Sequence, residues 1–197
     1  MLARAFRDNP LNRAVIGGHA ERRLRCNQLG MEVHLPVAHR FGEMSGAWRE
    51  GRLVGVLAAV PSFAWPLPAA ALGTRLRLAF RQGFGVASRW AEVSRALTAQ
   101  HPLGGHAYLA TLGVAPEAQG QGTGRALLAA WLAEVDAANS WAWLETDREE
   151  CVPLYRAAGF EIQGQTELHG VPVSLMERRP AGDAGGATAG ESAKLFA

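Results

Sequence analysis

Residues 106–135 read HAYLATLGVAPEAQGQGTGRALLAAWLAEV, an apolar run, a glycine-rich turn and a second apolar run without interruption. The first run, closed by Pro116, is rich in residues that favour a mostly buried β-strand over residues 108–114. In the second run, apolar residues recur at helical spacing, which predicts an amphipathic helix packed on a sheet. These spaced residues are Leu127, Leu128, Trp131, Leu132 and Val135. The segment therefore predicts a strand, a tight turn and a helix in direct succession.

The predicted turn carries glycines at 120, 122 and 124. Without a Cβ, these residues accept positive φ and let a ligand approach the backbone. The first amides of a helix have no intrahelical partner, so they can point together at an anionic group such as a diphosphate. A P-loop would need Lys followed by Ser or Thr, and the dinucleotide fingerprint would need G-x-G-x-x-G; neither is present. This leaves an anion-binding turn of another kind, or a tight turn without a ligand.

A second informative segment, residues 141–160, reads WAWLETDREECVPLYRAAGF and predicts a strand, a polar loop and a short helix that ends at a glycine. Together with Gln119-x-x-Gly122-x-Gly124, it resembles the GCN5-related N-acetyltransferase (GNAT) superfamily, which carries a pyrophosphate loop and then Leu-Tyr-x-x-x-Gly-Phe. Residues 161–178 are similar to the final hairpin of that family. Within it, residues 5–10, 108–114 and 144–146 most resemble the puromycin N-acetyltransferase-like small-amine acetyltransferases.

The resemblance implies an α+β fold in three layers. A central mixed, mostly antiparallel sheet would be flanked by helices and splayed between the strands at 106–114 and 141–146. The length of 197 residues and the 48% hydrophobic content suit one domain. We therefore expect a single GNAT domain over residues 1–180 and a flexible, disordered tail over 181–197.

One departure from the family lies at the start of the chain, where Met1 stands almost inside the first predicted helix. Family members usually open with a strand, so we expect the first strand to be missing here. Either the recorded start lies downstream of the native one, or the sheet lacks that strand, or a partner chain covers the exposed edge. Such a partner could be a second copy in a homodimer.

Upstream of residue 106 the patterns are weaker. The predicted elements are helices over residues 2–7 and 13–28, a hairpin of residues 41–48 and 53–60, an irregular connection over 62–68 and a helix spanning 86–97. Residues 31–40 stay open between helix and strand. The run Arg22-Arg23-x-Arg25 is interpreted as a solvated helix face rather than as a phosphate patch.

The resemblance implies that acetyl-CoA, the acetyl donor, is held at the glycine turn and along the preceding strand. The residues implied to bind it are Leu112, Gly113, Val114, Gln119, Gly120, Gln121, Gly122, Thr123, Gly124, Arg125 and Cys151. The amide of Leu112 or Gly113 would bind the thioester oxygen near a bulge, and the pantetheine arm would lie between the diverging strands. Cys151 departs from the family, which often has Asn there; a thiol is a poorer hydrogen-bond partner than an amide.

Acetyl transfer to an amine needs an uncharged nucleophile, a donor to the oxyanion and a proton source for the leaving thiolate. Tyr155 matches the family's tyrosine and is the expected proton source, because a phenol keeps its proton at neutral pH. The alternative is a packing residue. Glu145, within an apolar strand, is the candidate base, unless it faces solvent or binds an arginine. His106 titrates in a suitable range but stands at the strand entrance, and ordered water could serve instead.

The expected function is transfer of acetyl from acetyl-CoA to a primary amine of a small molecule, by direct attack in a ternary complex. The alternatives are a CoA-binding sensor or structural subunit without turnover, and an N-acetyltransferase of peptides or proteins. Aromatic residues at 48, 65, 84 and 90 either line the acceptor pocket or belong to the core. The presumed pocket segments hold no dense carboxylate cluster, which disfavours polycationic acceptors such as aminoglycosides.

Composition and charge exclude several other classes of function. The net charge is +2, from 20 scattered basic and 18 acidic residues, which gives no nucleic-acid footprint. The two cysteines are too few for a disulfide scaffold and indicate a reducing, cytoplasmic location. No apolar run has the length of a membrane span. The six histidines show no metal-binding spacing, so we expect no metal.

Overall fold

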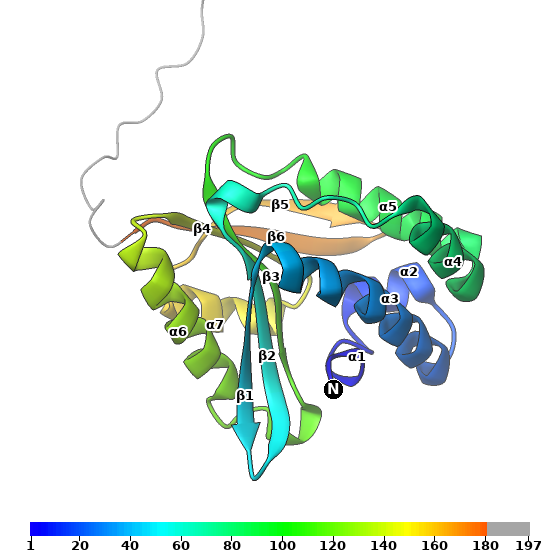
Figure 1. The fold of residues 1–197 in the computed structure, drawn as a ribbon, viewed down its shortest axis with the longest axis horizontal. Coiled ribbons are helices and arrows are strands. Elements are labelled where there is room, and N and C mark those ends of the chain that lie inside the picture. Colours follow the sequence, from blue (N-terminus) through cyan, green and yellow to red (C-terminus); the bar gives the residue numbers. More distant parts are fainter. Residues whose placement is uncertain (181–197) are drawn as a thin grey trace, which may run out of the picture.

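The computed structural model describes residues 1–180 and contains a six-stranded sheet with helices on both faces (Figure 1). The strands are β1 (Glu43–Arg49), β2 (Arg52–Val60), β3 (His106–Val114), β4 (Trp141–Thr146), β5 (Glu161–Leu168) and β6 (Val171–Arg178). Their order across the sheet is β1-β2-β3-β4-β6-β5. β3 and β4 run parallel, and all other neighbours are antiparallel. The predicted mixed, mostly antiparallel sheet is confirmed; the tail predicted over 181–197 lies outside the described residues.

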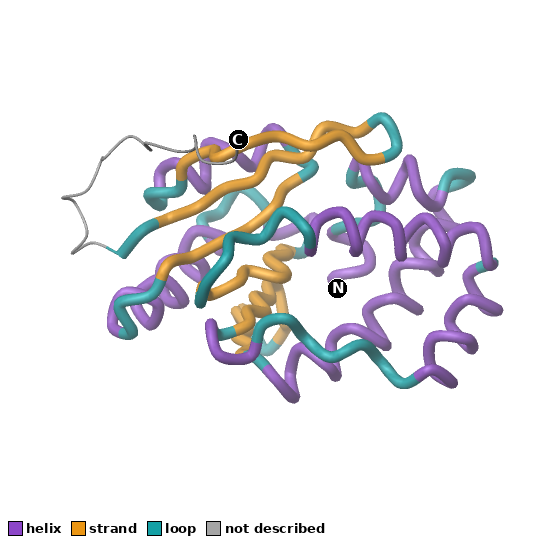
Figure 2. The backbone as a smooth tube through the Cα atoms, turned by 90° about the horizontal axis from the view of Figure 1, so that it is seen from above, coloured by secondary structure: helices purple, strands orange, loops and turns teal. Residues whose placement is uncertain are grey.

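Helices form two layers around the sheet. On one face lie α6 (Thr123–Ala137) and α7 (Val152–Ala157); on the other lie α1 to α5 (Figure 1). The bounds of the second group are α1 Leu2–Ala5, α2 Pro10–Ile16, α3 Ala20–Phe41, α4 Leu72–Gln82 and α5 Phe84–Thr98. Short 3₁₀ turns occupy Ser62–Ala64, Pro116–Ala118 and Glu149–Cys151. Figure 2 shows the larger group of helices lying together at one side of the strands, with the N-terminus among them.

Each helical layer encloses an apolar core of its own. On the α6 face, the five apolar residues predicted from helical spacing are all buried, and they pack in one cluster with Leu109 and Leu144 of the sheet. On the opposite face, apolar residues of α2, α3 and α5 pack against Val173 of β6. Met176 of the same strand belongs to the first cluster, because side chains alternate between the two faces of a strand. Burial from both sides holds the central strands in place.

The predicted hairpin is confirmed as β1 and β2. Glu50 and Gly51 connect the two strands, both with positive φ, of 50° and 73°. Positive φ at both central residues is typical of the tight turns that suit the twist of a hairpin. Among the described residues, no strand precedes α1 and β1 pairs only with β2, as the sequence predicts.

The N-terminal helices differ from the prediction. The segment 13–28 is interrupted at Gly17 and Gly18, whose φ values are 65° and 67°, so α2 and α3 are separate helices. α3 then continues through residues 31–40 and past Pro36, which resolves that segment as helix. α4 lies in a stretch for which no element was predicted. Local periodicity does not reveal the break at Gly17 and Gly18, because glycine is tolerated inside helical patterns.

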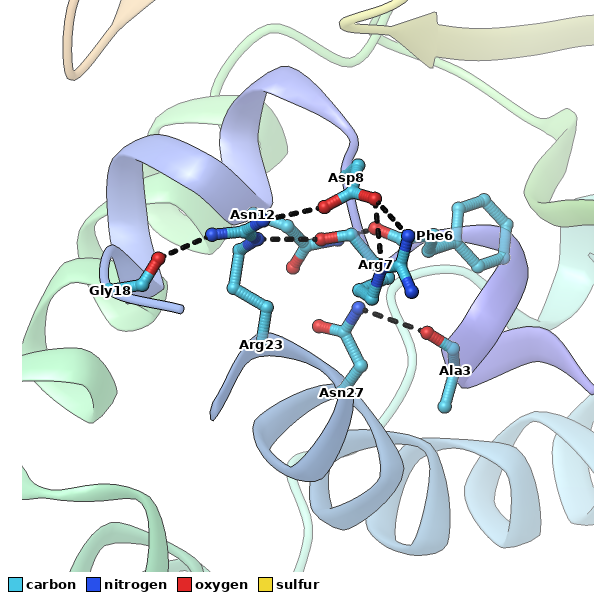
Figure 3. A network of polar contacts seen from close by, with 8 residues as sticks. All are labelled: Ala3, Phe6, Arg7, Asp8, Asn12, Gly18, Arg23 and Asn27. Carbon is cyan, nitrogen blue, oxygen red and sulfur yellow. Dashed lines mark hydrogen bonds and ion pairs between the residues drawn. The ribbon is translucent and has the colours of Figure 1, made fainter. Parts of the chain in front are cut away.

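Arg23 also corrects the sequence interpretation, since it does not belong to a solvated face. Its guanidinium donates to Asp8 Oδ1 at 2.6 Å, to the carbonyl of Arg7 at 3.2 Å and to that of Gly18 at 2.5 Å (Figure 3). Only 13% of the Arg23 side chain is exposed. Hydrogen bonds from Arg7 and Arg23 lower the pKa of Asp8 to about 2. α3 therefore holds the segment between α1 and α2 by charged hydrogen bonds.

Candidate active site

The turn between β3 and α6 has the conformation that its glycines predict. Gly120 and Gly122 have φ values of 72° and 81°, and α6 begins at Thr123 with Gly122 as its N-cap. A Cβ built at either glycine meets no atom within 4 Å, so the space beside the turn is open. Glycine at these two positions supplies the positive φ and keeps the backbone accessible.

Backbone amides of residues 120–125 donate to no described residue. The last hydrogen bond before them runs from Gln119 N to Pro116 O at 3.4 Å, and the next runs from Ala126 N to Gly122 O at 3.0 Å. Unpaired amides at the start of a 15-residue helix carry the positive end of the helix dipole. This arrangement can bind a diphosphate without any charged side chain.

The polar side chains of the turn brace its backbone. Gln119 Nε2 donates to the carbonyl of Val114 at 3.0 Å, and Gln121 Nε2 donates to that of Glu117 at 3.1 Å. Gln121 Oε1 in turn accepts from Arg49 at the end of β1. Of the other residues predicted at the turn, Thr123 is buried and Arg125 is exposed. The two glutamines therefore position the amides.

β3 and β4 part after three paired residues. Pairing runs from His106↔Trp141 to Tyr108↔Trp143; beyond it β3 continues beside β2, and β4 beside β6. The register of β2 and β3 shifts between Ala58 and Ala59, which leaves Ala110 of β3 without a paired residue. The predicted splay is thus present. Leu112 and Gly113 lie on its β3 side, downstream of this bulge.

Tyr155 lies on α7, one helical turn after Cys151. Tyr155 is 8% exposed and belongs to the apolar core, with its ring edge-on to Phe160 at 6.1 Å between centroids. Its hydroxyl has no hydrogen-bond partner among the described residues. Because every fully buried side-chain oxygen or nitrogen of these residues has a partner, the Tyr155 hydroxyl must be partly accessible to solvent. Burial raises the pKa of Tyr155, with the Cys151 sulfur adding to the effect. The phenol therefore stays protonated at neutral pH.

Cys151 precedes α7 and is partly buried against the same core. Burial raises the pKa of its thiol, an effect that the nearby guanidinium of Arg148 opposes. The thiol is therefore mostly protonated at neutral pH, which makes it a weak nucleophile.

Glu145 neither faces solvent nor binds an arginine. Its side chain is 5% exposed, and Oε1 lies 2.9 Å from His101 Nε2 and accepts a 2.7 Å hydrogen bond from Trp143 Nε1. Burial, and then the charge of this carboxylate, raise the pKa of the Tyr108 hydroxyl. His101 Nδ1 lies 2.8 Å from His106 Nε2, so the two base candidates, Glu145 and His106, are joined through His101.

His101 is a site residue that the sequence interpretation missed, and it lies against Trp65, one of the four aromatic residues proposed for the acceptor pocket or the core. Both lie in the connection between β2 and β3, and the Trp65 ring stacks on the His101 imidazole at 4.0 Å between centroids. The only local signal is that His101 and His106 flank the turn-forming residues Pro102, Gly104 and Gly105. Of the other proposed wall aromatics, Trp48 and Phe84 are 68% and 65% exposed, and Trp90 packs against the core of α2, α3 and α5.

Residues 46–162 match the family of the acetyltransferase (GNAT) domain, which is more than half of the 197-residue chain. This chain belongs to the GNAT family. The GNAT resemblance drawn from the glycine turn and from Leu154-Tyr155 is therefore confirmed, and the chain is an acyltransferase enzyme. GNAT acetyltransferases use acetyl-CoA, and unpaired amides at a helix N-terminus are able to bind a diphosphate.

A solved structure from Corynebacterium glutamicum, described as histone acetyltransferase HPA2 and related acetyltransferase, shares this fold, with a TM-score of 0.65 and 24% identity over 91% of this chain and 87% of that chain. The ribosomal-protein-S18-alanine N-acetyltransferase from Escherichia coli matches with a TM-score of 0.46 and 16% identity over 85% of this chain and 93% of that chain. At such identities, the first likeness concerns the fold alone.

Two features are absent from the described residues. Within residues 1–180, no group of three or more His, Cys, Asp or Glu side chains is arranged to hold a metal ion. In the same part of the chain, no helix combines the length and the apolar character needed to cross a membrane.

Proposed function

We propose that this GNAT enzyme moves an acetyl group from acetyl-CoA to a primary amine of a small molecule, by direct attack in a ternary complex. The observation that carries the proposal is the row of unpaired amides at residues 120–125, in the turn that follows β3, the strand that parts from β4 after Tyr108. A diphosphate bound there would let the pantetheine arm enter the gap and pair with strand backbone.

In the proposed reaction, the ammonium ion of the acceptor first loses a proton to Glu145. The neutral nitrogen then attacks the thioester carbonyl, the C–N bond forms, and an amide of β3 near Leu112 or Gly113 donates to the oxyanion. As the C–S bond breaks, Tyr155 gives its proton to the thiolate and regains one from the nitrogen. The raised pKa of Tyr155 supports this role, because the phenol is protonated when the thiolate forms.

The proposed acceptor is a small amine without many positive charges. The connection of residues 61–105, which supplies His101 and Trp65, carries five arginines and one glutamate, so it does not attract a polycation. This charge balance agrees with the resemblance to the puromycin-type acetyltransferases in residues 108–114. A cytoplasmic location, inferred from two free cysteines, completes the proposal.

The test is a thiol-release assay with acetyl-CoA and a panel of small amines, peptides and one aminoglycoside, in which the parent is compared with Tyr155→Phe. We expect release with small amines, and a loss of kcat of about 100-fold or more in Tyr155→Phe with unchanged CoA affinity. Release with peptides alone would instead indicate a peptide N-acetyltransferase. Tight CoA binding without release for any amine would indicate a CoA-binding sensor and overturn the proposal.

A further inference from the structure

Glu145, His101, His106 and the carbonyl of Gly104 form a continuous row of polar groups. Glu145 Oε1 lies 2.9 Å from His101 Nε2, His101 Nδ1 lies 2.8 Å from His106 Nε2, and His106 Nδ1 lies 3.1 Å from the Gly104 oxygen. His106 is 2% exposed, and the side chains of His101 and Glu145 are 4% and 5% exposed. Bulk solvent therefore barely reaches this row.

The row has one hydrogen fewer than its three hydrogen bonds need when Glu145 is ionised and both imidazoles are neutral. Each of its three contacts needs one hydrogen, and a carbonyl oxygen at one end can only accept. Two neutral imidazoles carry one N–H each, which fills two contacts. With Glu145 ionised, the remaining contact sets two lone pairs against each other wherever the two protons sit. The row is complete only after it takes up one more proton, and this proton also neutralises the buried carboxylate.

Among residues 1–180, no group near the row supplies that third proton. The indole of Trp143 donates to Glu145 and does not ionise. Burial, and the charge of Glu145, raise the pKa of Tyr108 well above its ordinary value, so its hydroxyl keeps its proton. Trp65 covers the His101 ring. Burial lowers the pKa of His106, and the charge of His101 lowers it further, while the hydrogen bond to Gly104 and the charge of Glu145 oppose this effect. The lowered pKa agrees with a neutral His106 that donates from Nδ1.

Glu145, at one end of the row, lies where β4 separates from β3. The last residue pair that joins β3 to β4 is Tyr108↔Trp143, and Glu145 lies two residues further along β4, in the part that has left β3. The two histidines come from the segment after α5 and from the first residue of β3. The connection between β2 and β3 thus contributes a proton-binding group to the gap.

On the basis of the proposed function, we propose that Glu145, His101 and His106 together accept the proton that the substrate amine loses. Glu145 receives the proton from the ammonium ion, and His101 and His106 are positioning residues that hold its carboxylate and share that proton through their hydrogen bonds. The amine nitrogen then forms its bond to the acetyl carbon, and the thiolate leaves with the second nitrogen proton delivered through Tyr155. The proton held by the row passes to water after the products depart.

The first test uses NMR of the protein with ¹⁵N-labelled histidine, without substrate. We expect His106 to carry its proton on Nδ1, and one proton to titrate as a property of both imidazoles together. In Glu145→Gln this shared titration should disappear. Independent titration of the two histidines, or a proton on His106 Nε2 alone, would overturn the proposal. This measurement needs no turnover, so its failure is distinct from a failure of the proposed function.

The second test is the pH profile of kcat/KM for the amine in His101→Gln, whose amide can still donate to Glu145 but cannot bind a proton. We expect the plateau to fall at least 10-fold and the rising limb to move to lower pH, because the carboxylate no longer shares the proton with the two imidazoles. The KM for acetyl-CoA should not change. His39→Gln, an exposed histidine of α3, is the matched control and should keep the parent profile. An unchanged midpoint in His101→Gln would assign that residue a purely structural role.

Discussion

Replacing Gly122 by alanine tests the diphosphate site through two separate quantities. The first is stability, because Gly122 has a φ of 81° and a left-handed conformation costs a residue with a Cβ about 1–2 kcal/mol. For a chain of this length, each 1 kcal/mol lowers the midpoint of thermal unfolding by roughly 2–4 °C. The new Cβ meets no atom within 4 Å, so no steric clash adds to this cost.

The second quantity is the affinity for coenzyme A. An alanine methyl at Gly122 would stand between the open amides and a bound diphosphate, so at least one hydrogen bond to a charged acceptor would be lost. Such a bond contributes about 1.5–3 kcal/mol, which corresponds to a roughly 10- to 150-fold weaker Kd. Isothermal titration calorimetry with coenzyme A at constant ionic strength measures this change.

Gly170→Ala is the matched control for this experiment. Gly170 lies in the β5–β6 turn with a φ of 77°, and a Cβ there also meets no atom within 4 Å. We expect both variants to lose similar stability but only Gly122→Ala to lose affinity. Equal affinities in the two variants would refute the inference that the amides of residues 120–125 bind the diphosphate.

Two further predictions concern polar contacts that hold the fold. Arg178→Lys should lower the free energy of unfolding by about 1–2 kcal/mol in urea titrations, because Arg178 donates to both oxygens of Asp136 at 2.7 and 2.8 Å and lysine has no such fork; an unchanged midpoint would contradict this. Asp8→Asn should cost about 1 kcal/mol near neutral pH. Since the pKa of Asp8 is lowered from 3.8 to about 2, its contribution is present above pH 3.8 and lost as the pH falls towards 2, so the parent and the variant should converge there.

Local signals account for what the sequence predicted well. In residues 106–135, the strand, the glycine turn and the helix are each specified by residues adjacent in the chain, and Leu128 and Trp131 are buried as their spacing indicates. The same holds for Tyr155, whose place on a short helix follows from Pro153 and Gly159. The roles of these residues in binding and catalysis remain predictions.

The parts that sequence reasoning missed depend on contacts between distant segments. Nothing near Glu145 in the chain indicates that an imidazole from the β2–β3 connection covers its carboxylate. Arg23 is similar, since a basic run on a helix gives no sign that one of its members reaches Asp8 and the Gly18 carbonyl. α4 is an exception, because Leu72, Leu76 and Phe80 recur at helical spacing, a local signal that the sequence interpretation overlooked, although all three side chains are exposed.

The short pairing of β3 with β4 has a mechanical consequence for the whole sheet. Because only residues 106–108 and 141–143 join these strands, the sheet consists of two three-stranded halves connected by one short paired segment. Within the halves, the hairpins β1–β2 and β5–β6 are paired along most of their length. Motion of the two halves about the short segment can widen or narrow the opening without breaking hydrogen bonds inside either half, so a long, flexible molecule can enter and leave while the rest of the fold stays intact.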